Sequence, residues 1–350
     1  MRIRSRKSIA FLEKRTPFHA ILLTHQERTY AMRHIKHIIL AVIFAYGGAQ
    51  AGALYPSQTI RLIVPFTPGS SSDVTARAIA QKISAPLGQA VVVENRSGAN
   101  GGIGMREVAH SKPDGYTLVV GTVSSTVVPS IISKNVPFDL FKDFTPVATM
   151  ANTPLLLTVA YDAPFTNVAD LVAAAKKAPG TMTYGNSAGL YRIAMEAVNY
   201  HAGIHLMAVP FKGPAQAAAE LLAGRLTVNP DALGAASSML QAKRMRALAV
   251  MGSNRTPAQP DVPTMQELGY KDFAFNGWLG ILAPAGTPQS VIDRLHKEVA
   301  EAVKSPDIQT LYTSLGMEPT VLTPQAYGDE MKKDMARYSD MAQRTGIEKE

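Results

Sequence analysis

The chain of 350 residues contains no cysteine. It therefore has no disulfide, no thiolate for catalysis and no cysteine-ligated metal site, as suits an exported protein that folds without disulfides. Histidine is also scarce, because only His110, His201, His205 and His296 remain after residue 51. His201 and His205 have the i, i+4 spacing of helical metal ligands, but Gly203 between them favours a helix end, and no third ligand accompanies them. We expect no bound metal.

Charged residues make up only 18% of the chain, yet its formal net charge is +8. Of the 35 basic and 27 acidic residues, nine and two lie in residues 1–51, so the remainder carries 26 and 25. A phosphate backbone requires a basic surface, which this nearly neutral remainder lacks. We expect no nucleic-acid partner.

No nucleotide motif is complete. TPGSSSD (67–73) lacks the G-K-[ST] ending of a P-loop, and the glycines of SGANGGIG (97–104) do not fit G-x-G-x-x-G. We therefore expect no cofactor.

The N-terminal apolar run at 38–46 is shorter than the roughly 20 residues that span a bilayer. It follows the basic segment 32–37 and precedes Ala49 and Ala51, which form an A-x-A cleavage pattern. These features predict a secretory signal peptide over residues 1–51, with Met32 as an alternative start, and a mature protein in the periplasm. A buried N-terminal helix is the alternative.

Short β-branched runs at 59–66, 90–95 and 116–122 alternate with helix-like segments, and the alternation restarts after 154–160. This order predicts an α/β fold of parallel βαβ units with helices on both faces. Two long C-terminal helices are each predicted to open with Thr-Pro, at Thr287 and Thr323.

Two loops of small residues follow a predicted strand and precede a predicted helix: TPGSSSD (67–73) and GNSAG (185–189). Free N–H groups and the positive end of the helix dipole can bind an anion at such a position without Lys or Arg. Facing each other across a cleft, the two loops would each hold part of a dicarboxylate. Alternatively, both are ordinary βα turns, with Asp73 as a helix cap.

The loop GNSAG also matches the G-x-S-x-G nucleophile elbow of serine hydrolases, with Ser187 as the nucleophile. Such a hydrolase needs an acid and then a histidine later in the chain. His201 and His205 follow Ser187 too closely, and His296 lies within a predicted helix. We therefore predict that Ser187 holds a ligand and that the chain is no enzyme; a serine hydrolase remains the alternative.

The chain after the signal peptide resembles the Bug family, the extracytoplasmic solute-binding proteins of tripartite tricarboxylate transporters. The matching segments occur in family order and include VVVENRSGANGGIG, PDGYTLVVGT, TYGNSAG, VPFKGPAQAAAELLAGRL and GWLGILAPAGTP. Together with DFTPVATM, RMRALAVMG and PDVPTMQELGY they span nearly all of the mature sequence.

The resemblance implies a two-lobed periplasmic-binding-protein fold of type II, in which each lobe is a mostly parallel sheet flanked by helices. Residues 52–156 with 278–350 would form the first lobe and 157–277 the second. The ligand would be a small carboxylate, namely a di- or tricarboxylate, an acidic amino acid or an aromatic acid. It would be enclosed by hinge closure and delivered to the membrane permease subunits. We expect the protein to be a monomer.

Carried over position by position, the resemblance implies the following ligand-binding residues: Phe66, Gly69, Ser70, Ser71, Asp73, Ser124 and Ser125 from the first lobe, and Ser187, Ala188, Gly189, Lys212, Gly213 and Asp231 from the second. Two positions depart from the family pattern, Ser70 in place of a second glycine and LYR at 190–192. Lys212 is alternatively a solvated turn residue. Asp231 would repel a carboxylate, so its presence in the cleft would indicate an amino or hydroxyl group on the ligand.

Overall fold

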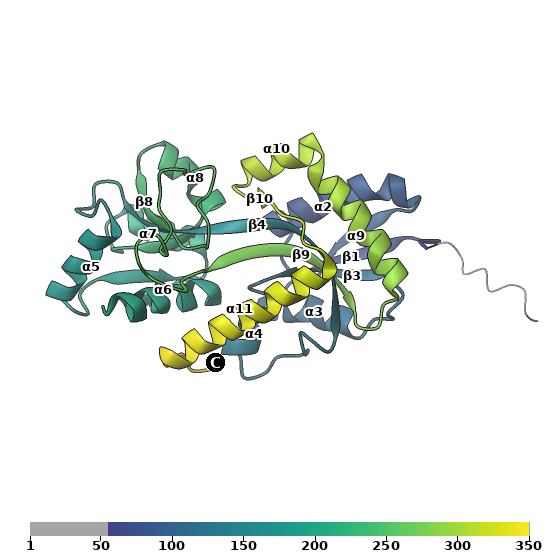
Figure 1. Cartoon of the computed structure of the whole chain (residues 1–350), viewed down its shortest axis with the longest axis horizontal. Helices are drawn as coiled ribbons and strands as arrows, with labels where there is room; N and C mark the ends of the chain where they lie inside the picture. The colour runs from purple at the N-terminus through teal and green to yellow at the C-terminus, as the bar shows by residue number, and fades with distance from the viewer. Residues whose placement is uncertain (1–54, 350) are drawn as a thin grey trace, which may run out of the picture. The chain divides into compact units, whose positions relative to one another are not determined.

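Strands and helices alternate along residues 55–349, the part of the chain that the computed structural model describes (Figure 1). The signal peptide predicted for residues 1–51 lies outside these residues. The strands are β1 (Ile60–Val64), β2 (Val91–Asn95), β3 (Thr117–Thr122), β4 (Phe144–Ala160), β5 (Thr183–Asn186), β6 (Met207–Pro210), β7 (Asn229–Ala232), β8 (Met245–Val250), β9 (Asn276–Pro284) and β10 (Glu318–Pro319).

The helices include two long C-terminal ones. They are α2 (Ser71–Leu87), α3 (Gly102–Ala109), α4 (Val127–Ile132), α5 (Val168–Lys177), α6 (Gly189–Ala202), α7 (Pro214–Leu222), α8 (Leu233–Gln241), α9 (Gln289–Lys304), α10 (Pro306–Ser314) and α11 (Pro324–Arg344), with a short 3-10 turn η1 (Ala99–Gly101). No helix within residues 55–349 is long and apolar enough to cross a membrane.

The sheets are mixed. β1 pairs in parallel with β2 and β3, as the βαβ pattern predicts, and β5 pairs in parallel with β6. The order of the main path is β10-β4-β9-β3-β1-β2, and every pair that involves β4 or β9 is antiparallel. The sheets therefore contain more antiparallel strand pairs than the mostly parallel arrangement that the sequence predicts. The reason is that β4 and β9 lie next to each other and run in opposite directions.

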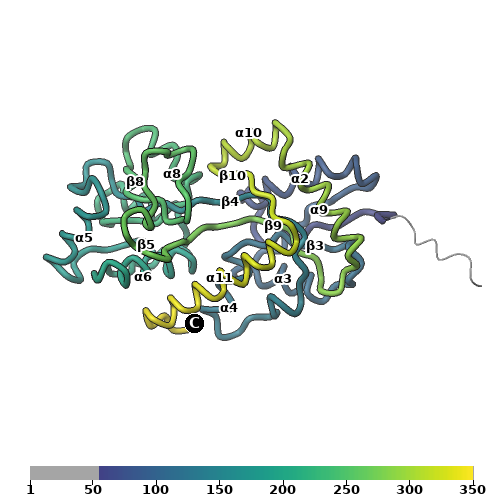
Figure 2. Tube along the Cα trace, viewed as in Figure 1, coloured from purple at the N-terminus to yellow at the C-terminus, as the bar shows by residue number. Residues whose placement is uncertain are grey.

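The long strand β4 belongs to two groups of strands. Its first part, through Pro154, pairs with β9, and its last part, from Leu155, pairs with β7 and β8. Figure 1 shows β4 and β9 running from the group around β1 and β3 to the group that contains β8. The trace in Figure 2 shows these two strands between the two groups, with α11 alongside.

The helix ends follow the local sequence. Gly203 ends α6 with φ of 60°, a conformation that glycine adopts without strain, so His201 and His205 do not share one helix. Thr323 caps α11, and its hydroxyl accepts a hydrogen bond from the N–H of Ala326. The same prediction is wrong at Thr287, whose hydroxyl donates to the carbonyl of Pro284 instead, so that α9 begins after Pro288.

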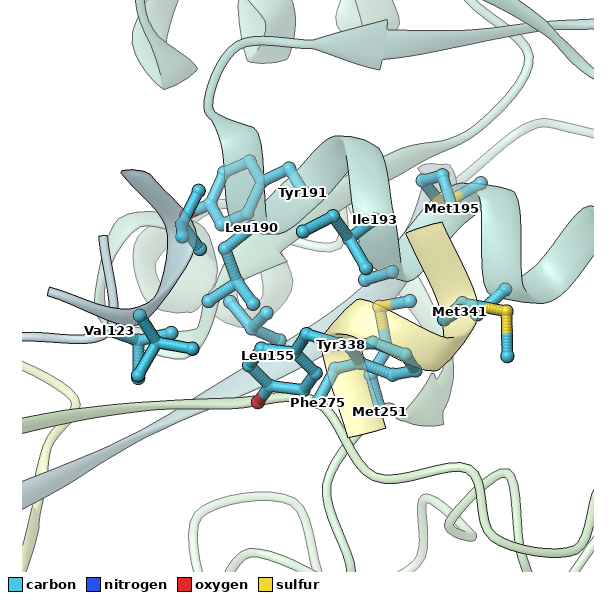
Figure 3. Packing of buried hydrophobic residues seen from close by; sticks show 14 of the residues in the cluster. Val123, Leu155, Leu190, Tyr191, Ile193, Met195, Met251, Phe275, Tyr338 and Met341 are labelled. Atoms are coloured by element: carbon cyan, nitrogen blue, oxygen red, sulfur yellow. The ribbon is translucent and has the colours of Figure 1, made fainter. Parts of the chain in front are cut away.

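Apolar packing is continuous around the shared strands. One buried cluster includes Val123, Leu155, Leu190, Tyr338 and Met341, which come from the loop after β3 and from β4, α6 and α11 (Figure 3). A second cluster joins α2 and α9 to the other face of β1, β3 and β4. Full burial of one such large side chain contributes about 1.5–3 kcal/mol. The packing therefore fixes the strand ends and helix starts described next.

Candidate ligand-binding site

A cavity of about 470 Å³ lies where several strands end and several helices begin. Its lining includes residues of the first turns of α2, α6, α7 and α8, the loop after β3, the middle of β4 and the start of β9. The volume is in the range that binds small molecules. Elements from both strand groups therefore line this one cavity.

A second arm of about 350 Å³ continues this cavity toward α4. The two arms share Phe66, Ser124, Tyr191 and Pro214, and the second arm adds Ser187, Ala188 and Gly189. We refer to the two arms together as the cleft. Among the described residues that line it there is no Asp, Glu, Lys, Arg or His.

The N-terminus of α2 forms one wall of the cleft, through Ser71 and Ser72. The hydroxyl of Ser70 caps this helix and accepts the N–H of Asp73 at 3.3 Å. The N–H groups of Ser71 and Ser72 belong to the first turn, where a helix provides no acceptor of its own. They are therefore suited to an anion, which the helix dipole also favours.

The N-terminus of α6 forms another part of the cleft wall. Its cap residue, Ala188, has no side-chain acceptor, and the first intrahelical bond runs from the N–H of Arg192 to the Ala188 carbonyl at 3.0 Å. The first-turn amides of Gly189, Leu190 and Tyr191 precede that bond. Ser187 adds a hydroxyl oxygen that is buried without a hydrogen-bond partner in residues 55–349.

Gly189 is required by the close approach of α4. A Cβ atom at this position would lie 2.5 Å from Cγ1 of Val128 and 2.6 Å from Cδ1 of Ile132. Real Cβ contacts of that length essentially do not occur, so only glycine lets α6 begin here without displacing the side chains of α4.

The thirteen residues implied by the resemblance lie in three kinds of place. Phe66, Ser71, Ser124, Ser187, Ala188 and Gly189 line the cleft. Gly69, Ser70 and Gly213 belong to the turns that precede α2 and α7, and Lys212 is exposed next to one of them. Ser125, Asp73 and Asp231 are buried and line neither arm.

Asp73 is fixed by hydrogen bonds within the first strand group. Its carboxylate accepts the N–H of Gly69 at 2.9 Å, Nε of Arg77 at 3.0 Å and Nδ2 of Asn95 at 2.9 Å. Burial alone would raise the pKa of Asp73, but the hydrogen bonds from Arg77, Gly69 and Asn95 together lower it below its ordinary value. The acid thus stays ionised and holds the loop onto α2.

Asp231 is buried on β7, with 1% of its surface exposed. Its carboxylate accepts the hydroxyl of Thr158 and, at 2.8 Å, Nδ2 of Asn229. Burial raises the pKa of Asp231, and these two hydrogen bonds oppose that change. The expectation of an amino or hydroxyl group on the ligand depended on Asp231 facing the cleft, and this arrangement gives it no support.

Ser125 has a comparable internal role. Its hydroxyl accepts the N–H of Thr122 at 3.1 Å, and its own N–H donates to the hydroxyl of Thr122 at 3.1 Å. These bonds shape the loop after β3 and leave the neighbouring Ser124 in the cleft lining.

Comparison with known proteins agrees with this arrangement. Residues 75–347 match the family model of the tripartite tricarboxylate transporter family receptor, TctC. The chain belongs to this family. It is 31% identical to Protein BugT of Bordetella pertussis over 88% of this chain and 96% of that protein.

Solved structures of similar proteins extend the match to three dimensions. Rpa4515 of R. palustris with adipate is 34% identical, with a TM-score of 0.74 over 85% of this chain and 100% of that one. The periplasmic binding protein BugD is 30% identical, with a TM-score of 0.69 over 85% and 100%. MatC from Rhodopseudomonas palustris with bound malate is 27% identical, with a TM-score of 0.68 over 82% and 99%.

Membership in the TctC family confirms the α/β periplasmic-binding-protein fold and identifies the chain as a transport receptor rather than an enzyme. The serine-hydrolase alternative is therefore excluded, and the G-x-S-x-G match at Ser187 is not a nucleophile elbow.

The sequence analysis did not identify several residues that line the cleft of this TctC protein. Leu155, Tyr191, Trp278 and Met317 line the cleft, although each looks like an ordinary core residue in the sequence. The sequence carries only weak signals for these residues. LYR at 190–192, which contains Tyr191, departs from the family pattern, and Trp278 lies in a segment that matches the family.

Proposed function

We propose that this receptor captures a small carboxylate in the periplasm, encloses it in the cleft and delivers it to the membrane permease of a tripartite transporter. One observation carries the proposal: helix N-termini from both strand groups line a cleft that contains no charged side chain within the described residues. Such a site favours anions through backbone amides.

The amides of two helix starts would share the negative charge of the ligand. A charge near a helix N-terminus gains about 0.3–1 kcal/mol from the dipole at exposed sites, and more where water is excluded. Hydrogen bonds from N–H groups to an ionised carboxylate are stronger than neutral ones. The starts of α2 and α6 therefore suit the carboxylates of a di-acid, with the unpartnered hydroxyl of Ser187 as a further donor.

The rest of the lining favours a ligand with an apolar body. Phe66, Leu155, Leu190, Trp278 and Met317 supply carbon surface, which suits an aliphatic chain or a ring. The described cleft lining contains no carboxylate side chain that could accept a hydrogen bond from an ammonium group, and this argues against an acidic amino acid as the ligand. Adipate, bound by the relative from R. palustris, has this combination of two acids and a carbon chain.

We propose the same two lobes as the sequence predicts: residues 52–156 with 278–350 form the first lobe, and residues 157–277 form the second. The change of β4 partners between Pro154 and Leu155 and the start of β9 at Asn276 support it. Closure would bend these two strands and bring the walls of the cleft onto the ligand. The closed form, as a monomer, would then be recognised by the permease subunits.

A binding screen on the mature chain from residue 52 tests the proposal. Adipate, malate, glutamate and benzoate are added in a thermal-shift assay and then in calorimetry, with 1,6-hexanediol as the uncharged control for adipate. A ligand at a hundred times its Kd raises the free energy of unfolding by about 2.7 kcal/mol. Stabilisation by a carboxylate and not by the diol supports the proposal, and no stabilisation by any of the four acids at millimolar concentration counts against it.

A further inference from the structure

A second cavity, of about 310 Å³, lies behind the cleft on the same strands. Consecutive residues line the cleft and this second cavity in turn: Thr153 and Asn152 in β4, Gly277 and Asn276 in β9, and Met317 and Glu318 at the start of β10. Trp278 lines both. It therefore forms part of the wall between them.

The helix α11 holds the indole ring of Trp278. The indole N–H donates a hydrogen bond to Oδ2 of Asp334 at 2.9 Å. The ring of Tyr327 packs edge-on against the indole, with 5.1 Å between ring centroids and an interplanar angle of 84°. Tryptophan has a single N–H and no acceptor, so Asp334 satisfies its entire hydrogen-bonding capacity.

Asp334 is nearly enclosed, with 4% of its side chain exposed. On α11 itself it faces Glu330, Tyr338 and Arg337, whose Nη2 donates to Oδ1 at 2.7 Å. From β10, Glu318 lines the same cavity. Burial raises the pKa of Asp334 to about 6, the charge of Glu330 acts in the same direction, and Trp278, Arg337 and Tyr338 oppose it.

We propose that Asp334 is a positioning residue for ligand capture, which holds the Trp278 indole in the cleft wall from the opposite side of the sheet. The inference rests on the proposed function, because it concerns the wall against which the body of the ligand packs. Asp334 lines the second cavity and not the cleft, so it acts through Trp278. An ionised Asp334 accepts the indole N–H more strongly than a protonated one.

The chain offers a direct probe, because Trp278 is its only tryptophan. Asp334→Leu removes the acceptor at similar volume, and Asp334→Asn keeps an acceptor oxygen but removes the charge. Asp329→Asn is the matched control, since Asp329 lies on the same helix, is 47% exposed and lines neither cavity. The readouts are tryptophan emission and acrylamide quenching of the ligand-free protein from pH 5 to 8, and the Kd of adipate by calorimetry.

We expect the emission of the unchanged protein to shift around pH 6, and the Asp334→Asn protein to show no such inflection. In Asp334→Leu, acrylamide quenching rises and the Kd of adipate increases about tenfold, the effect expected from loss of a hydrogen bond to a charged group. Asp329→Asn behaves like the unchanged protein. In a Trp278→Phe background, which lacks the indole N–H, changing Asp334 to Asn leaves the Kd of adipate unaltered.

The inference is overturned if Asp334→Leu matches the unchanged protein in both quenching and Kd. If that variant does not fold, an inflection near pH 6 that persists in Asp334→Asn overturns it equally. If the unchanged protein binds none of the four acids, the proposed function fails. The quenching and pH profiles of the ligand-free proteins then still decide whether Asp334 positions the indole.

Discussion

The backbone N–H of Gly69 donates a hydrogen bond to Oδ2 of Asp73, four residues later, at 2.9 Å. Nδ2 of Asn95 donates to the other oxygen of the same carboxylate, also at 2.9 Å. A buried acid thus ties the loop before α2 to both its helix and a neighbouring strand. The amides of Ser71 and Ser72 remain in the cleft lining, and their position depends on Asp73.

Asp73→Ala should therefore reduce both stability and ligand affinity. Loss of a carboxylate that accepts several hydrogen bonds costs about 2–3 kcal/mol of unfolding free energy, and a looser loop weakens adipate binding. Chemical denaturation and calorimetry measure the two effects, with the exposed Asp162→Ala as control. Unchanged stability and affinity in Asp73→Ala would contradict the role assigned to this acid.

The same residue gives a pH dependence of known sign. The pKa of Asp73 is lower in the folded chain than in the unfolded one, so its stabilisation is present above the ordinary aspartate pKa of about 4 and is lost as the pH falls below it. Denaturation curves from pH 7 to pH 3 should show a smaller loss for Asp73→Ala than for the unchanged protein. Parallel curves would show that Asp73 does not titrate as its contacts indicate.

Gly189→Ala tests the contact between α6 and α4. The added methyl would meet side-chain atoms of Val128 and Ile132 at 2.5 and 2.6 Å, so these side chains or one of the helices must shift, and overpacking of this kind costs about 1–3 kcal/mol. Gly328→Ala is the control: Gly328 lies in α11 and lines neither arm of the cleft, and an added Cβ would meet only Cγ of Pro146, at an ordinary contact distance of 3.4 Å. We expect a lower melting temperature and a larger Kd of adipate in Gly189→Ala alone. Equal effects of both substitutions would speak against the close helix contact.

Ser187→Ala tests whether the Ser187 hydroxyl contacts the ligand. Removing the hydroxyl should weaken carboxylate binding by roughly three- to tenfold, the worth of one hydrogen bond, without loss of folding. The buried Ser187 oxygen has no protein partner in the described chain, so its removal breaks no internal contact. Calorimetry with adipate measures the change. Affinity equal to that of the unchanged protein would show that this hydroxyl does not touch the ligand.

Much of the framework was predictable from local sequence. The helix predicted after TPGSSSD (67–73) forms as Ser71–Leu87, and the strand predicted over 59–66 forms as Ile60–Val64, because the apolar period and the turn residues act over a few positions. The full length of β4 was not predictable from local sequence, because Pro146 and Pro154 interrupt the pattern of a strand. The structure accommodates Pro146 beside a register shift in the pairing with β9.

The cleft was predictable only in part, for a related reason. A loop before a helix signals free amides locally, which led to the loops that contain Ser71 and Ser187, whereas Ser124 came from the family resemblance. Trp278 and Met317 enter the cleft through contacts between segments that lie far from those loops in the sequence. An apolar residue in such a contact has the same sequence signature as one in the core. Asp73 and Asp231 show the converse. The sequence indicates them as ligand-binding residues, but a motif does not reveal that a side chain is buried and hydrogen-bonded to other residues of the chain.

Asp334 should give the stability curve a slope opposite to that of Asp73. Its folded pKa of about 6 exceeds the unfolded value near 4, so the folded state binds the extra proton, and the unfolding free energy falls as the pH rises from 4 to 6. The displacement of about two pKa units corresponds to roughly 2–3 kcal/mol. Asp334→Asn should remove this decline in denaturation curves. A decline that remains in the variant would assign the proton to another group.

The most direct measurement of the central claim, that amides at the starts of α2 and α6 hold the ligand, is an amide NMR titration of the mature protein with adipate. The resonances of Ser71 and Ser72 in α2 and of Leu190 and Tyr191 in α6 are expected to shift together and to saturate at the same adipate concentration. Binding of adipate that leaves the amides of either helix unmoved would contradict the account.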